Sequence, residues 1–100
     1  MFTPWPVAQV ATERRRLTVL QYLAVTPGFE AAAMILRDRC REIGVPTHDD
    51  QILSCVHWLS EQALVTVRQI GNEPIARITA MGRDVSQGFR THPGVMQPDP

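Results

Sequence analysis

Apolar residues recur at the spacing of a helix face in three stretches of this chain. In the first, leucines follow one another at Leu17, Leu20 and Leu23, before a Pro-Gly pair that ends a helix. In the second, apolar side chains recur at i, i+4, i+8 and i+11 from Ala32, and in the third Thr47 stands as an N-cap before two acidic residues. These patterns predict three helices: Gln9 or Thr12 to Val25, Glu30 to Ile43, and Thr47 to Gln62.

Two shorter apolar runs and a fourth helical segment complete the predicted domain. The runs, Leu64–Val67 and Ile75–Ile78, flank a Gly-Asn turn and predict a β-hairpin. A short helix is predicted from Thr79 to Gly88. Residues 9–89 therefore form one domain, mainly α with a small β-hairpin, in the element order of a winged helix-turn-helix: three helices, a two-stranded wing and a closing helix.

The two ends of the chain are rich in proline and aromatic residues. Pro4 and Pro6 predict an extended N-terminal arm over residues 1–8 that carries two large aromatic side chains, Phe2 and Trp5. Three of the eight prolines fall in residues 90–100, which are predicted to form an extended or flexible tail.

Composition limits the classes of function. The chain has 100 residues, the length of one domain, and 44% of them are hydrophobic. Ten arginines balance ten acidic residues and there is no lysine, so the basic excess typical of nucleic-acid-binding proteins is absent. No segment has the length and apolarity of a membrane span or a signal peptide. We therefore expect no membrane partner and a cytoplasmic protein of a bacterial host cell.

The chemistry-bearing residues do not form a catalytic or metal-binding pattern. Cys40 and Cys55 are 15 residues apart and lack the spacing of a zinc site, so both are interpreted as small core residues. Cys55 and His57 lie at i and i+2 of one helix, where side chains point about 200° apart and cannot act as a nucleophile and its base. We expect no catalytic residue, no cofactor and no metal, and hence a protein that is not an enzyme.

Two segments resemble bacterial winged-helix regulators. The run from His57 to Val67 (HWLSEQALVTV) resembles the end of the recognition helix and its entry into the wing, with Ala63 where the family often has glycine. Ile78-Thr79-Ala80-Met81-Gly82 resembles the Leu-Thr-x-x-Gly segment that follows the wing. Over residues 12–90 the chain is similar to small ArsR-like winged-helix proteins of Mu-like phages and prophages. The resemblance implies a DNA-binding transcriptional regulator, without the metal-sensing cysteine pair of true ArsR sensors.

Binding to duplex DNA requires hydrogen-bond donors on the solvent face of the third predicted helix. At about 100° per residue, Gln51, Ser54 and His57 fall on this face and are the predicted base contacts. Asp50 and Glu61 share the face and would repel phosphates, which counts against ordinary reading of the major groove. Direct DNA binding by this helix is therefore left open.

The predicted phosphate contacts come from other elements. They are two arginines of the second predicted helix and one on each hairpin strand: Arg37, Arg41, Arg68 and Arg77. The consecutive arginines at positions 14–16 fan around the first predicted helix and cannot form one stripe. A homodimer is expected, because one such domain reads only a short half-site.

The alternative is an adaptor that uses the same fold to bind a protein and not DNA. Its interface would consist of the acidic face of the third predicted helix, Trp58 and the two arm aromatics, Phe2 and Trp5. Trp58 lies off the core-facing arc, so it is expected either to cover the base of the wing or to be an exposed anchor. The two hypotheses differ in salt dependence, which is steep for DNA and shallow for an apolar interface.

Overall fold

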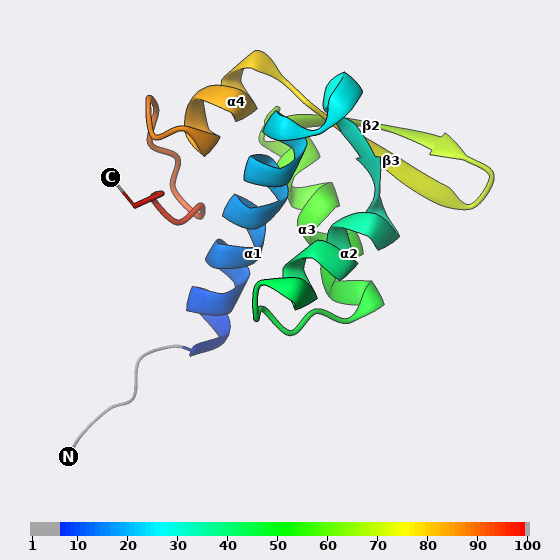
Figure 1. The fold of residues 1–100 in the computed structure, drawn as a ribbon, viewed down its shortest axis with the longest axis horizontal. Coiled ribbons are helices and arrows are strands. Elements are labelled where there is room, and N and C mark those ends of the chain that lie inside the picture. The colour runs from blue at the N-terminus through cyan, green and yellow to red at the C-terminus, as the bar shows by residue number, and fades with distance from the viewer. Residues whose placement is uncertain (1–6, 100) are drawn as a thin grey trace.

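A computed structural model of the chain describes residues 7–99. Four helices and a three-stranded antiparallel sheet form a single α/β domain (Figure 1). Of the helices described, none is long and apolar enough to cross a membrane. Along the chain the elements are α1 (Val7–Val25), a 3₁₀ turn (Pro27–Phe29), β1 (Glu30–Ala32), α2 (Ala33–Glu42), α3 (Asp49–Glu61), β2 (Val65–Ile70), β3 (Glu73–Ile78) and α4 (Ala80–Ser86).

The helices pack around one apolar core, with α1 in contact with α2, α3 and α4. The leucines that predicted the first helix are buried, as are Ile52, Val56 and Leu59 on the predicted inner face of α3. The hairpin is confirmed, and α4 begins where predicted, since the Thr79 hydroxyl caps it by accepting a hydrogen bond from the Gly82 N–H at 3.0 Å. Periodicity therefore identified the four helices and the residues that form the core, although not every helix start.

The start of the second predicted helix is wrong, because Glu30–Ala32 forms a strand. Gly28 and Phe29 have positive φ angles, which turn the chain out of helical conformation before Glu30. The strand pairs antiparallel with β3, Ala31 opposite Ala76, and gives the sheet order β1-β3-β2. The sheet also caps the helix that follows, since the Glu73 carboxylate accepts a hydrogen bond from the backbone N–H of Met34 at 3.1 Å.

Two predicted helix starts shift by a few residues. Helix α1 begins at Val7, so residues 7 and 8 belong to the helix and not to the arm; the rest of the predicted arm, with Phe2 and Trp5, lies outside the described residues. The N-cap of α3 is His48 and not Thr47. Thr47 is instead buried, and its hydroxyl donates to the Val45 carbonyl at 2.9 Å.

The predicted flexible tail folds back along α1 (Figure 1). A turn closes when the Val95 N–H donates to the His92 carbonyl, with Pro93 second and Gly94 third at a φ of 91°. The turn is attached to α1 by a hydrogen bond from the Met96 N–H to the Glu13 carbonyl, and Val95 is buried in the core. Burial of Val95 and turn chemistry outweigh the proline content that predicted an extended segment.

Candidate functional site

Helix α3 presents a polar face to solvent. Gln51, Ser54 and His57 are all exposed on it, and Asp50 and Glu61 lie on the same face, as predicted. The His57 imidazole lies 3.5 Å from the Glu61 carboxylate. This face can therefore offer hydrogen-bond donors to a ligand, and it also carries negative charge.

Three of the four arginines predicted to contact phosphate are engaged within the protein. Arg37 pairs with Asp38 at 2.9 Å and with Asp49 at 2.6 Å, and this pairing holds the pKa of the Asp49 carboxyl below its usual value. Arg41 donates to a backbone carbonyl at 2.9 Å, and Arg68 pairs with Glu30 at 2.8 Å. The surface ion pairs of Arg37 and Arg68 are weak enough for these side chains to change partner, but none of the three arginines is a free cation.

Arg77 is the fourth arginine of the predicted set. It is exposed on β3, and in the sheet it lies between Glu30 of β1 and Thr66 of β2. Arg68 and Arg77 therefore sit on the hairpin strands as predicted.

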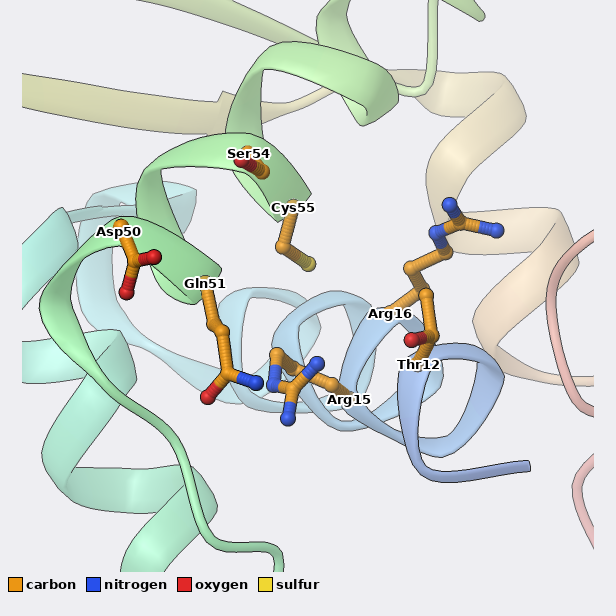
Figure 2. Close-up of a pocket in the computed structure, with 7 residues that line it drawn as sticks. All are labelled: Thr12, Arg15, Arg16, Asp50, Gln51, Ser54 and Cys55. Carbon is orange, nitrogen blue, oxygen red and sulfur yellow. The ribbon is translucent and has the colours of Figure 1, made fainter. Parts of the chain in front are cut away.

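A pocket of about 180 Å³ between α1 and α3 contains two further arginines (Figure 2). It is lined by Thr12, Arg15, Arg16, Asp50, Gln51, Ser54 and Cys55. The sequence analysis missed Arg15 and Arg16 as site residues. A signal was present, since a helical projection of α1 puts both on the face that carries Val19, Leu20 and Leu23.

Arg15 is held firmly at the floor of this pocket. Its side chain is only 5% exposed, its Nε donates to the Thr47 hydroxyl at 3.0 Å, and an Nη donates to the Pro46 carbonyl at 2.8 Å. Arg15 thereby links α1 to the connection between α2 and α3, directly before the first turn of α3.

Arg16 and Trp58 form a stack that the tail covers. The Arg16 guanidinium lies 3.8 Å from the centre of the Trp58 ring and donates to the Gly94 carbonyl at 2.9 Å. His92 meets the same ring edge-on, with 5.6 Å between ring centres. Trp58 is therefore half-buried against Arg16 and the tail and is not a fully exposed side chain. The sequence did not indicate that the tail returns to α3.

The two cysteines are buried in the described structure, and Cys55 lies at the inner wall of the pocket. Burial raises the pKa of the Cys55 thiol to about 12 and also raises the pKa of Cys40. In the unfolded chain these thiols ionise at lower pH than in the folded protein. The free energy of unfolding therefore decreases as pH rises from about 9 towards the raised pKa of Cys55, about 12. Neither thiol is a ready nucleophile at neutral pH.

We expect native protein at pH 8 to react with Ellman's reagent only as fast as it unfolds, and both thiols to react at once in denaturant. The reason is that both side chains are buried and protonated. The control is Ser54→Cys, one position away and exposed, which should react immediately with a stoichiometry of one. Immediate reaction of unmodified native protein would contradict the burial of the cysteines.

The fold and the site define a small α/β domain that presents a polar helix between a basic pocket and a β-hairpin. The chain belongs to the family of gp26 of Escherichia phage Mu, an uncharacterized protein to which it is 33% identical over 94 residues. The match covers 94% of this chain and 97% of gp26. No family model and no solved structure matches the chain. The predicted resemblance to Mu-like phage proteins is therefore confirmed.

Proposed function

We propose that this phage protein is a winged-helix DNA-binding domain of the ArsR-like type that acts as a transcriptional regulator and binds duplex DNA as a homodimer. One observation carries the proposal. The exposed donors Gln51, Ser54 and His57 lie on a single helix that has the arginines of the α1–α3 pocket on one flank and the hairpin on the other, with Arg68 and Arg77 on the hairpin face turned away from α3. A helix in the major groove meets a phosphate backbone on each side.

The element order supports a winged helix. Helices α2 and α3 form the helix-turn-helix, β2 and β3 form the wing, and α3 takes the place of the recognition helix. Strand β1 joins the wing to the connection that precedes α2, so the wing and the recognition helix belong to one packed unit.

The chemistry of α3 fits base reading at its N-terminal half. The hydroxyl of Ser54 suits purine edges, whereas the Gln51 carbonyl oxygen already accepts a hydrogen bond from the His48 N–H, and the acidic Glu61 lies at the opposite end of the helix. Asp50 lies nearer to the proposed groove, where its carboxylate can accept a hydrogen bond from a cytosine amino group or repel a phosphate group. Specificity is therefore expected to depend on Ser54, with His57 as the second exposed donor of this face.

Fluorescence anisotropy with a labelled mixed-sequence duplex tests the proposal. We expect binding at 50 mM salt that weakens steeply towards 200 mM, since each phosphate contact contributes about 0.9 to the slope of log K against log salt. The double variant Arg68→Ala/Arg77→Ala should reduce that slope by about 2 and weaken binding about tenfold. Arg90→Ala, an exposed arginine beyond α4, is the control and should bind normally. Absence of binding at 50 mM salt would overturn the proposal.

A second function, protein binding by the same fold, is favoured by one specific surface. Leu53 is 42% exposed on α3 and lines a second hollow, between α3 and the hairpin, with Val67 and Pro74. Ile35 and Ile70 are also large exposed aliphatic side chains. An apolar surface of this kind suits a protein partner whose binding changes little with salt. Salt-insensitive capture of a partner, lost in Leu53→Asp, would favour this function over DNA binding.

A further inference from the structure

The charge of Arg15 is buried without a counter-ion in the described part of the chain. Its two hydrogen bonds go to neutral oxygens, of Thr47 and Pro46. No carboxylate of residues 7–99 lies within 4.0 Å of the Arg15 or Arg16 guanidinium, whereas Arg37, Arg39 and Arg68 all have acidic partners. Buried charges in proteins are usually paired, so the pocket holds positive charge that an anion would neutralise.

The polar groups around this charge are mostly donors. The Gln51 carbonyl oxygen already accepts a hydrogen bond from the His48 N–H at 2.8 Å, which leaves the Gln51 NH₂ group to face the pocket. Figure 2 shows that the Gln51 amide and the Arg15 guanidinium point toward one another. Two sets of donors that face each other are suited to hold an acceptor between them. Ser54 adds a hydroxyl on the opposite wall.

Arg16 provides a second incompletely bonded cation at the other side of the pocket. Its Nε is buried and has no hydrogen-bond partner among the described residues. Its position is fixed by the Trp58 ring beneath it and by the Gly94 carbonyl. Asp50, across the pocket from Arg16 in Figure 2, is exposed and pairs with neither arginine, so it reduces the positive potential without cancelling it.

We propose that the pocket between α1 and α3 binds a phosphate group, with Arg15 and the Gln51 amide as its principal donors and Arg16 as the second positive charge. Arginine and amide donors arranged around a concave site are suited to phosphate oxygens. The further step, that this phosphate belongs to the DNA backbone beside α3, rests on the proposed function. It would supply a phosphate contact on the flank of α3 opposite the wing.

The decisive variant is Gln51→Glu. A glutamate side chain has nearly the same shape, can keep the hydrogen bond from the His48 N–H, since glutamate is favoured at this capping position, and places a carboxylate beside Arg15. We expect Gln51→Glu to raise the melting temperature in phosphate-free buffer and to lose phosphate binding. The matched control is Gln21→Glu, which makes the same charge change at an exposed position of α1 outside this pocket.

Phosphate binding is measured by titrating sodium phosphate at constant ionic strength with sodium chloride. The readouts are the melting temperature and the NMR shift of the Arg15 side-chain Nε–H. Because phosphate also stabilises proteins by exclusion from their surface, the inference requires a saturable response in Gln21→Glu that is absent in Gln51→Glu. Asp50→Asn should bind phosphate more tightly, by about threefold. Equal responses in the two glutamate variants would overturn the phosphate site.

Titration of duplex DNA distinguishes the two sources of phosphate. If the backbone is the ligand, Gln51→Glu should weaken duplex binding about tenfold relative to Gln21→Glu and reduce the salt slope by about 1. If inorganic phosphate binds and duplex does not, the site stands and the proposed function fails. If duplex binds equally to both variants and phosphate has no effect on either, the proposed function stands and the phosphate site is overturned.

Discussion

Replacement of Gly82 by alanine is expected to lower the free energy of unfolding by about 3 kcal/mol. A β-carbon at this position would collide with the backbone carbonyl oxygen of Leu64 and would lie 2.7 Å from Cγ1 of Ile78. The carbonyl cannot move away, because it also accepts the backbone N–H of Thr79 at 3.1 Å. Helix α4 would therefore have to move away from Leu64 and Ile78. Urea denaturation followed by circular dichroism measures the loss.

Gly44→Ala is the matched control for this prediction. Gly44 has a φ of 86°, and a β-carbon there meets no atom within 4 Å. Its replacement therefore costs only the left-handed backbone conformation, about 1 kcal/mol. If the two alanine variants lose the same stability, the close approach of α4 to Leu64 is wrong.

Replacement of Gly94 by valine is expected to detach the tail from Trp58 at a cost of about 2 kcal/mol. Gly94 has a φ of 91°, and a β-carbon would lie 2.8 Å from the Trp58 ring and 3.1 Å from the Arg16 guanidinium. Without the turn, the Trp58 ring loses its contact with His92 and becomes more exposed to solvent. We expect the fluorescence of Trp58 to shift to longer wavelength and to be quenched more strongly by acrylamide.

This measurement is best made in a Trp5→Phe background, so that Trp58 is the single tryptophan of the chain. Thr91→Val, at an exposed position just before the turn, is the control and should leave the emission unchanged. An unchanged spectrum in Gly94→Val would mean that the tail does not cover Trp58 in solution.

The helices and their inner faces could be predicted because the signal is local. Spacing of leucines and aliphatic residues determines which side of α1 and α3 is buried, and Thr79 determines where α4 begins. The exposed face of α3 follows from the same periodicity, so Gln51, Ser54 and His57 were placed correctly on one surface.

The features that were not predicted depend on contacts between distant segments. Strand β1 is only three residues long and exists because β3 offers it a free edge, which its own sequence does not indicate. The tail packs against Trp58, and Arg15 is buried against Thr47. Both contacts join segments that are far apart in the chain. The ion-pair partners of the arginines could not be predicted for the same reason, since the partner of Arg68 is Glu30, 38 positions away.

The pairing of β1 with β3 has a consequence for how the domain meets any partner. A two-stranded hairpin alone is marginally stable in water, but this one is tied by β1 and by Glu73 to the beginning of α2. The pairing of β1 with β3 brings together two strands that are separated in the chain by α2, α3 and β2. The hairpin is then ordered together with the rest of the domain, and a partner meets a surface that folding has already ordered.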